Sequence, residues 1–578
     1  MNPMNRRQLL RATGVIALAG VAARLPVSAQ ENGNLPGPRF FDVKSDGATG
    51  DGKSLDTVSI NRAIVACHAS GGGMVYLPPG VYLSGTVILK SNVTLHLEAG
   101  ATLLGSKNIS DYTPQPQVSS KPGAVAKPFV FGSDAADTTE KHLIFARDAE
   151  NIGLTGLGRI DGQGPTFWVP SDKKLLPPEE AWREAATHAW KAIPRPSPML
   201  EFYNCKNVHI EDVRIENSPG WTMRPLECDN IFIRGITIKN PCGINTDGID
   251  VIGCKNVLIS DCVIDTGDDA ICLKSESPYG GEVRVTKNIT ITNCVLTCCC
   301  NGLKFGTATF GSFENIIFSN SIIFSEDVEP KSRVFSGIAL EMVDGGSLEG
   351  VLISNIRMQR VRTPIFIRIG NRHPRADGAT GTLRGVRIEN LHATGSILTS
   401  SITGQPGFDV EDITLSGIRI ESEESGKAAW ASRTIPELPK GYPEASMFGR
   451  LPAYGLYCRH VKGLRLHDVE FQAATGEERP VIFCDDVKDV EIDGLRSSPI
   501  NGAQPVIKLV QTREALLRAC VAPKGTKTFL EVQGAKTEHV TLMNSELSRA
   551  ETVVASGAEV PKNAVTLAGN AEGKRAGA

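Results

Sequence analysis

A short phrase recurs along most of this chain: a polar residue, a few alternating apolar residues, a small turn residue, and then a second alternating run. Successive copies are mostly about 25 to 35 residues apart, a spacing typical of solenoid proteins. Alternation with a period of two, rich in β-branched residues, predicts strands, and no helical period competes with it. The copies begin at Asn207, Asn230, Asn256, Asn288, Asn315, Gly350, Gly385, Asp412, Gly463 and Asp489.

Two or three short strands cannot bury their own apolar face, so neighbouring repeats must stack on one another. The prediction is an all-β chain folded as a right-handed parallel β-helix, with coils about 4.8 Å apart. A β-propeller or a sandwich fits less well, because hairpin turn signals are sparse and the repeats are shorter than a propeller blade. Residues 56–69 are expected to form a helix over the N-terminal end, with Ile60, Ala63, Ile64 and Cys67 on one face.

The β-helix is expected to form one catalytic domain over residues 30–545, interrupted near 164–198 and 425–452. Both insertions carry aromatic residues, and long excursions from a solenoid often build its binding site. Those aromatic rings either stack on sugar rings or fix the loops to the body. The last stretch, 546–578, is rich in Ala, Gly and Lys and is expected to be a flexible tail.

Residues 1–29 are typical of an export signal of the twin-arginine type. Arg6 and Arg7 precede an apolar run over 15–23, and residues 27–29 suit a signal peptidase. That run is shorter than the roughly 20 residues that span a bilayer, and no later stretch is apolar enough to do so. The alternative is a cytoplasmic amphipathic start with a chance arginine pair. The prediction is a periplasmic or extracellular protein that folds before it is exported.

Charge and cysteines limit the partners. A formal net charge of -3 excludes a strongly basic surface, so nucleic acid is not an expected partner. Separately, the protein is expected to be a monomer. The chain has 14 cysteines, but many recur at one place in successive repeats, as Cys205, Cys228 and Cys254 do. A buried thiol at such a place packs as a small hydrophobic group. Most cysteines are therefore expected to be free, with 298–300 as a possible source of one disulfide.

Alignment of the repeats predicts one outward-facing row of polar side chains. The strands placed in register are 220–224, 248–252, 270–274, 302–306, 337–341 and 364–368. Alternate residues of a strand face opposite sides. The inward stack is then Ile249, Ile271, Leu303, Ile338 and Ile365. The outer face presents Arg224, Asp250, Lys274, Lys304, Glu341 and Arg368, and the preceding turn presents Asp247, Asp269 and Asn301, with Asp268 beside them.

Three aspartates this close repel one another, and at least one pKa should rise. A cluster of like charges costs stability and is rarely kept without a use, so this one favours a catalytic site. The alternatives are a solvated Asp-rich turn and a calcium site, since several carboxylates suit calcium. Nearby Lys and Arg residues compete with a cation, so neither a metal nor another cofactor is expected.

At this point the sequence resembles a family. Asn245-Thr246-Asp247-Gly248-Ile249-Asp250 and Gly267-Asp268-Asp269 are similar to the signature motifs of polygalacturonase-like glycoside hydrolases, family 28, and Asn217-Ser218-Pro219-Gly220-Trp221 resembles its strand leading into the cleft. The resemblance runs from about residue 41 to at least residue 372. It implies an inverting β-helix enzyme that hydrolyses pectic galacturonosyl linkages without a metal. It also implies that Asp268 is the general acid, that Asp247 and Asp269 hold and activate water, and that Asn245 belongs to the substrate site.

The departures from the family pattern concern the substrate. The family's Gly-His-Gly is here Cys300-Asn301-Gly302, its Arg-Ile-Lys carboxylate clamp falls on Ala339-Leu340-Glu341, and the histidine after the cleft tryptophan is replaced by Arg224. Either Lys304 and Arg368 supply the missing positive charge, or the leaving sugar is neutral, such as rhamnose, and Glu341 accepts bonds from its hydroxyls. A rhamnogalacturonan-type or galacturonan-type substrate is therefore expected. A polysaccharide lyase and a non-catalytic glycan-binding β-helix are the other readings of these residues.

Overall fold

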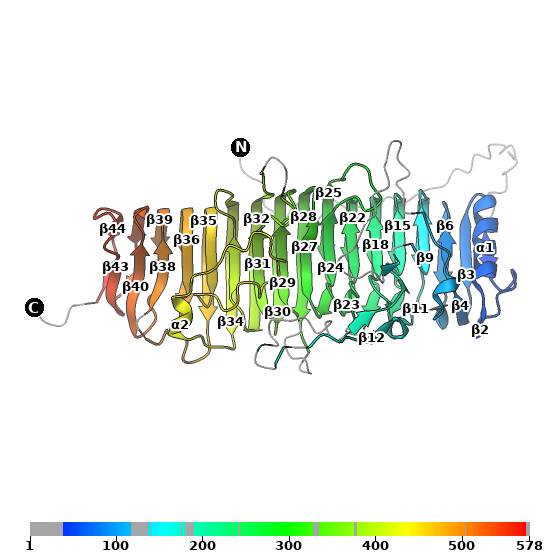
Figure 1. Ribbon diagram of the computed structural model, residues 1–578, viewed down its shortest axis with the longest axis horizontal. Helices are drawn as coiled ribbons and strands as arrows, with labels where there is room; N and C mark the ends of the chain where they lie inside the picture. The colour runs from blue at the N-terminus through cyan, green and yellow to red at the C-terminus, as the bar shows by residue number, and fades with distance from the viewer. Residues whose placement is uncertain are drawn as a thin grey trace, which may run out of the picture. The chain divides into compact units, whose positions relative to one another are not determined.

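The computed structural model describes residues 39–116, 137–138, 140–174, 176–177, 180, 190–240, 243–326, 334–374, 378–502 and 504–573. The predicted export signal, residues 1–29, lies outside this part. Residues 40–578 form one compact unit. Its strands stack coil upon coil from the blue to the red end of Figure 1.

The coils form a parallel β-helix, as predicted. One sheet of 39 strands contains three rows, and within each row the strands of successive coils pair in parallel. The first row is β5 (Val87–Leu89), β9 (Ile144–Arg147), β15 (Leu200–Tyr203), β18 (Met223–Leu226), β21 (Ile249–Ile252), β24 (Ile271–Ser275), β27 (Asn301–Thr309), β29 (Ser336–Met342), β31 (Thr363–Ile369), β33 (Ser400–Thr403), β35 (Leu456–Gln472), β36 (Ile482–Asp493), β38 (Pro505–Val510), β40 (Thr526–Gln533) and β43 (Ala550–Ser556).

The other two rows complete each coil. The second row is β1 (Phe40–Asp42), β3 (Gly73–Leu77), β6 (Val93–Leu97), β10 (Glu150–Thr155), β16 (Lys206–Glu211), β19 (Asp229–Arg234), β22 (Lys255–Ser260), β25 (Thr286–Thr292), β28 (Ser312–Phe324), β30 (Ser347–Gln359), β32 (Thr382–Ser396), β34 (Val410–Ser422), β39 (Arg513–Arg518), β41 (Glu538–Met543) and β44 (Val565–Ala568). The third row is β2 (Asp51–Leu55), β4 (Gly80–Ser84), β7 (Ala101–Gly105), β11 (Arg159–Asp161), β17 (Arg214–Glu216), β20 (Thr237–Lys239), β23 (Val263–Thr266), β26 (Val295–Cys298) and β37 (Arg496–Ser497). The long strands β28, β30, β32 and β34 extend from the second row into the third. Strand β35 runs through all three rows, and β36 runs from the first row into the second.

The predicted cap is the helix α1 (Thr57–Ala69), which packs at the N-terminal end of the coils (Figure 1). Its buried residues are Ile60, Ala63, Ile64 and Cys67, the face expected from the sequence. This helix covers apolar side chains of the first coil that no further coil could bury. No helix in the described part of the chain is long and apolar enough to cross a bilayer.

The turn residue that opens each copy of the repeated phrase has one backbone conformation throughout. Asn256 has φ of 58°, and the equivalent Gly350 and Asp412 have φ of 72° and 53°. Asn, Asp and Gly tolerate this left-handed conformation best, so the phrase begins with them. From Asn92 to Asn315 the side-chain amides also bond from coil to coil, for example Asn256 Nδ2 to Asn230 Oδ1 at 3.0 Å. We refer to this series, Asn92, Asn151, Asn207, Asn230, Asn256, Asn288 and Asn315, as the asparagine ladder.

The register is as predicted for five of the six aligned strands. The inward stack from Ile249 to Ile365 pairs residue by residue and is fully buried. The first strand differs, because Met223 and not Trp221 pairs with Ile249. The Ser218 hydroxyl donates to the carbonyl of Gly220 at 2.7 Å, which makes this segment a turn. A shift of two residues preserves the alternation, so Arg224 stays on the outward face.

The predicted flexible tail is wrong for residues 546–573. There β43 pairs with β40 and β44 pairs with β41, so the stack continues for another coil. Backbone hydrogen bonds to the preceding coil hold these strands although few of their side chains are buried. Residues 574–578 lie outside the described part.

Most of the cysteines are free thiols, as predicted. The 12 cysteines described as free are all buried. The backbone N–H of Cys205 donates to Cys228 Sγ and that of Cys228 donates to Cys254 Sγ, both at 3.3 Å. Cys299, within the stretch expected to supply a bridge, is disulfide-bonded.

Candidate active site

The turn before the first row of strands brings the predicted carboxylates together. Gly248 donates its N–H to the carbonyl of Asp269 at 2.9 Å, and Ala270 donates to the carbonyl of Asn301 at 2.9 Å. Asp247, Asp269 and Asn301 therefore occupy the same position on three successive coils. Asp268 lies beside Asp269 and is half-buried, whereas the other three are buried.

Asp269 is held as a carboxylate. Lys304 Nζ lies 3.1 Å from its Oδ2, and Oδ1 accepts bonds from the N–H and the Nδ2 of Asn301 at 3.0 and 2.8 Å. Burial disfavours the charge, but Lys304, Lys274 and Asn301 outweigh burial and lower the pKa of Asp269. Asn301 thus orients the Asp269 carboxylate.

Asp268 differs in protonation from its neighbour. Burial and then the negative charge of Asp269 raise the pKa of Asp268 to about 7, against the opposing effect of Lys304. One of its oxygens accepts the N–H of Asp269 at 2.9 Å. Two adjacent carboxyls with opposite pKa shifts are the arrangement that supports one acid and one base at neutral pH.

Asp247 completes the group of three. Burial and then Asp268 raise the pKa of Asp247 well above its ordinary value. Its Oδ1 is buried and has no hydrogen-bond partner among the described residues. This oxygen is free to bind a water or a sugar hydroxyl.

Asp250, on β21 after Asp247, and Lys274, on β24 after Asp269, form a buried ion pair between neighbouring coils, and Lys274 Nζ also lies 3.1 Å from Cys272 Sγ. Burial opposes the charge on Lys274, but nearby carboxylates, Asp250 first, outweigh it and raise the pKa of Lys274. Lys274 Nζ also lies 4.3 Å from the ring centre of Trp221. The same side holds Glu276, whose pKa burial raises to about 7 and whose Oε1 has no partner among the described residues.

Arg224 is fully buried, and its guanidinium forms hydrogen bonds with other side chains of the protein. Its Nε donates to Glu201 Oε2 at 2.6 Å and its Nη2 to the Tyr279 hydroxyl at 3.0 Å. Asn245, the remaining residue of the signature, is half-buried with φ of 51° and shows no side-chain hydrogen bond to a described residue. The structure therefore places Arg224 in a supporting network and leaves the Asn245 amide available.

Lys304 lies near two further elements: Glu341, on a later coil, and the second insertion. Glu341 is fully buried, and neither of its oxygens has a hydrogen-bond partner among the described residues. Burial raises the pKa of Glu341 well above its ordinary value, although Lys304 opposes this. From the insertion, Tyr442 places its ring centre 5.7 Å from Lys304 Nζ, and Glu444 Oε1 lies 3.8 Å from Cys300 Sγ.

Arg368 contacts the second insertion. Its Nη2 donates to the carbonyls of Glu437 and Leu438 at 2.7 and 2.8 Å, and its guanidinium lies 4.9 Å from the ring centre of Phe448. The insertion with α2 (Ala428–Ala431) lies over the first row of strands (Figure 1). An apolar cluster anchors it there: Phe335, Ala339, Phe366, Ile435, Ala445, Phe448, Leu451 and Tyr457. Arg368 is therefore an anchor for this insertion.

Some aromatic residues of the two insertions anchor them to the body, and others remain exposed. Trp168 is buried and donates its Nε1–H to the carbonyl of Pro219 at 2.8 Å, so it fixes the first insertion to the body. Phe448 does the same in the second. Tyr442 is 54% exposed and Trp190 is 38% exposed, so these two rings remain accessible to a sugar. Trp182 lies outside the described residues.

The only metal-ligand grouping at this site consists of Asp268, Asp269 and Cys300, among the residues that the structure describes; their ligand atoms lie within 4.8 Å of one another. Lys304 already provides a cation to Asp269 at 3.1 Å. A metal would have to compete with that ammonium group, as expected from the sequence.

Sequence reasoning missed Glu201, Tyr279, Glu276 and Glu444. Glu201 neutralises Arg224, Tyr279 forms hydrogen bonds with both of them, and Glu276 lies in the loop after β24. Tyr442 and Glu444 lie in an insertion that the sequence marks as a possible wall of the site. An acidic residue next to its aromatic residue was the available signal.

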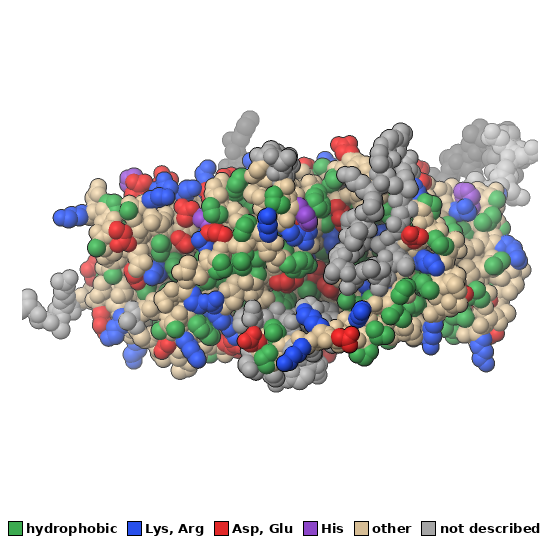
Figure 2. Space-filling model, in the orientation of Figure 1, with side chains coloured by type: hydrophobic (Ala, Val, Ile, Leu, Met, Phe, Trp, Pro, Cys, Tyr) green, Lys and Arg blue, Asp and Glu red, His purple; other side chains and the backbone are tan. Residues whose placement is uncertain are grey.

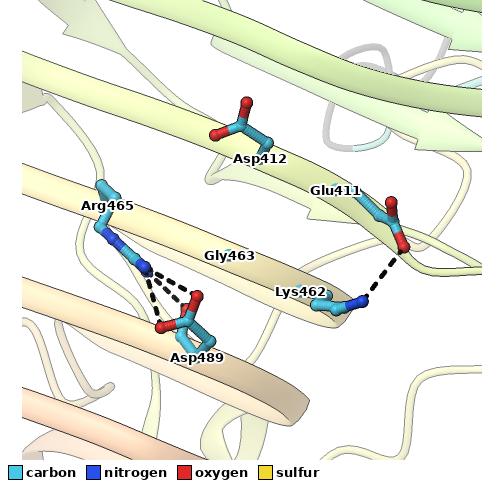
Figure 3. Close-up of a pocket in the computed structure, with 6 residues that line it drawn as sticks. All are labelled: Glu411, Asp412, Lys462, Gly463, Arg465 and Asp489. Carbon is cyan, nitrogen blue, oxygen red and sulfur yellow. Dashed lines mark hydrogen bonds and ion pairs between the residues drawn. The ribbon is translucent and has the colours of Figure 1, made fainter.

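A separate pocket of about 220 Å³ lies over β34, β35 and β36 (Figure 3). It opens where Gly463 replaces a side chain between Asp412 and Asp489, on the row that carries the asparagine ladder in earlier coils. Arg465 closes one side through two bonds to Asp489, at 2.8 and 2.7 Å. None of the predicted site residues lines it. On the face in Figure 2, acidic and basic side chains are mixed, with no continuous basic area among the described residues.

Comparisons with known proteins agree with the resemblance in the motifs. The model of the glycosyl hydrolases family 28 matches residues 89–438. A protein named "Probable polygalacturonase" from Vitis vinifera is 26% identical over 411 residues, which cover 68% of this chain and 77% of the relative. An endo-polygalacturonase from Pectobacterium carotovorum subsp. carotovorum is 29% identical over 321 residues, 54% of this chain and 72% of that protein. The crystal structure of a hyperthermoactive exopolygalacturonase from Thermotoga maritima superposes with a TM-score of 0.51 at 27% identity, covering 66% of this chain and 87% of that one.

Proposed function

The chain belongs to the glycosyl hydrolases family 28, and we propose that it is an inverting hydrolase of galacturonosyl linkages in a rhamnogalacturonan-type or galacturonan-type pectic glycan. The observation that carries the mechanism is the opposite pKa shift of two adjacent residues. Asp269 is held ionised by Lys304 and Asn301, while Asp268 stays protonated up to about pH 7. These are the states required of a general base and a general acid.

In this mechanism Asp268 donates its proton to the glycosidic oxygen as the bond from that oxygen to the anomeric carbon breaks. A water on the other face of the sugar attacks the anomeric carbon, and Asp269 takes the proton from that water. Asp247 holds the same water through its Oδ1, which has no protein partner in the described part. Attack from the face opposite to the leaving group inverts the anomeric centre.

The test is the product profile of the mature protein on polygalacturonate and on rhamnogalacturonan, with Asp268→Asn alongside. Reducing sugar released by the wild type and lost in the variant is the expected result. A product with the ultraviolet absorbance of an unsaturated uronide would replace the proposal with a lyase. Binding of both glycans without turnover would replace it with a glycan-binding protein.

The proposal includes export by the twin-arginine route, supported by Arg6 and Arg7 ahead of the apolar run at 15–23. Changing both arginines to lysine should keep the protein in the cytoplasm, whereas Lys44→Arg should not alter export. Fractionation of cells that produce each variant measures this. Full export of the double-lysine variant would contradict the route.

A further inference from the structure

Glu341 offers two acceptors that the protein does not use. The side chain is fully buried on β29, and among the described residues no donor lies within hydrogen-bond distance of either oxygen. Leaving a buried acceptor unsatisfied is costly, so such groups in a site mark a place where a ligand supplies the donors. Lys304 faces this carboxyl from β27.

Glu444 offers a third acceptor from the second insertion. Its Oε2 has no partner among the described residues, while its Oε1 lies 3.8 Å from Cys300 Sγ. Tyr442 of the same insertion places its ring centre 5.7 Å from Lys304 Nζ, and Glu341 lies on β29, which pairs with the strand of Lys304. Two carboxyls from separate elements, Glu341 and Glu444, therefore act on the ammonium group that is paired with Asp269.

The basic groups there already have partners within the protein, although the buried Arg368 Nε lacks one among the described residues. Lys304 is paired with Asp269 at 3.1 Å, and Arg368 is bound by carbonyls of the insertion. Arg372 is paired with Asp344 at 2.9 Å. Arg362, which faces Glu444, has its guanidinium 4.6 Å from the ring centre of Phe335 and has a further partner. A uronate carboxylate placed here would meet Glu341 and Glu444, and it would have to compete with the partners that these cations already have.

The leaving sugar is the ligand that reaches this volume. Asp268 protonates the oxygen of the leaving sugar in the proposed mechanism, and an oxygen of Asp268 lies within 4.8 Å of Cys300 Sγ. Cys300 in turn contacts Glu444. The sugar attached to the protonated oxygen is thus placed against Glu444 and, across Lys304, against Glu341.

We infer that Glu341 and Glu444 form the subsite of the leaving sugar and select a sugar that bears hydroxyls but no carboxylate. This inference rests on the proposed function, which fixes where the leaving sugar lies. Hydroxyls donate to the unused oxygens, and a site built to hydrogen-bond hydroxyls discriminates strongly against ligands that leave its groups unpaired. A second carboxylate in such a place is rejected by like charge wherever these carboxyls are ionised, as Glu444, with a pKa of about 7, is at pH 8.

The experiment compares two disaccharides that differ in one group. Each has galacturonic acid as the non-reducing sugar, followed either by galactose or by galacturonic acid, so that only the carboxylate of the leaving sugar changes. At pH 8 we expect kcat/KM about tenfold or more in favour of the galactose compound for the wild type. Glu341→Gln/Glu444→Gln should bring the two values to within about twofold, because amides neither repel a carboxylate nor require protonation.

The matched control is Glu423→Gln, an exposed glutamate just before the second insertion, which should keep the wild-type preference. Equal rates for the two disaccharides, or a wild-type preference for the acidic one, would overturn the inference. So would a full preference retained by the double glutamine variant.

A binding measurement separates this inference from the proposed hydrolysis. Calorimetric titration of Asp268→Asn with each disaccharide reports selectivity without turnover. Tighter binding of the galactose compound supports the subsite even if no wild-type hydrolysis is seen, a result that would defeat the proposed function alone. Tighter binding of the acidic compound, or no binding of either, would overturn the subsite.

Discussion

The raised pKa of Asp268 makes the alkaline limit of activity a sensitive probe of the site. If Asp268 is the general acid, kcat/KM falls tenfold per pH unit above its pKa, about 7 in the free enzyme. The charged groups that act on it are Asp269, Lys304 and Glu444, with Asp247 coupled to it from the preceding coil. Removing one of these charges without touching the others should move this limit in a calculable direction.

Glu444→Gln is that perturbation. Cys300 Sγ lies 3.8 Å from Glu444 Oε1 and within 4.8 Å of an Asp268 oxygen, so the two carboxylates are at most about 9 Å apart. With an effective dielectric constant between about 20 and 80, one charge at this distance acts with about 0.5 to 2 kcal/mol, or about 0.4 to 1.5 pKa units. Burial raises the pKa of Glu444 itself to about 7, so it is partly protonated near the limit and the lower part of that range applies.

The expected result is a fall of about 0.4 to 0.7 unit in the alkaline pKa of kcat/KM, because loss of a negative neighbour makes Asp268 easier to ionise. Initial rates from pH 4 to pH 9 on a galacturonide substrate measure it, with Glu423→Gln as the control that should leave the limit in place. An unchanged limit in Glu444→Gln would show that the limit is not set by Asp268 in this cluster. A limit that rises would refute the electrostatic reasoning altogether.

Three further changes test other parts of the structure. Asn301→Ala should lower kcat by about 10- to 100-fold in steady-state assays, because Asp269 loses the amide that orients it; an unchanged kcat would remove Asn301 from the site. Asn256→Gly should lower the free energy of unfolding by about 1 to 2 kcal/mol in urea titrations, through loss of two ladder bonds, and Asn256→Ala should cost about 1 kcal/mol more because φ is positive there; equal costs would contradict the conformational argument. Ile338→Ala should cost about 2 to 5 kcal/mol in the same titration, since it opens a cavity in the fully buried stack, and a cost below about 1 kcal/mol would show that the coils collapse around it.

The coil register could be predicted because one turn position repeats its conformation. Every predicted copy from Asn207 to Asp489 begins at a residue with positive φ. Only Asn, Asp and Gly adopt a positive φ at little energetic cost, so the position can be recognised in the sequence. The error at Trp221 has a local cause, the turn held by the Ser218 hydroxyl, which a strand pattern does not reveal.

The three aspartates could be predicted for the same reason, since they occupy equal positions on neighbouring coils or lie next to one that does. The partners from outside the repeat could not. Glu444 meets Cys300 across 144 residues of sequence, and nothing in the period of the coils fixes where an insertion folds back. Arg368 faces the expected side of its strand, but its guanidinium donates hydrogen bonds to carbonyls of the insertion, which the repeat does not predict. The last coil was missed because backbone pairing holds it with little apolar burial.

The asparagine ladder has a consequence for how such a scaffold changes. Each ladder amide between the two end members is joined to the coil before and the coil after, so this corner keeps the same register along the ladder. Both long insertions instead leave the body between the third and first rows, the corner that carries Asp247 and Asp269. One corner therefore preserves the architecture while another is open to alteration. New walls for the substrate can be acquired, lost or exchanged around the same carboxylates without any coil having to find a new partner.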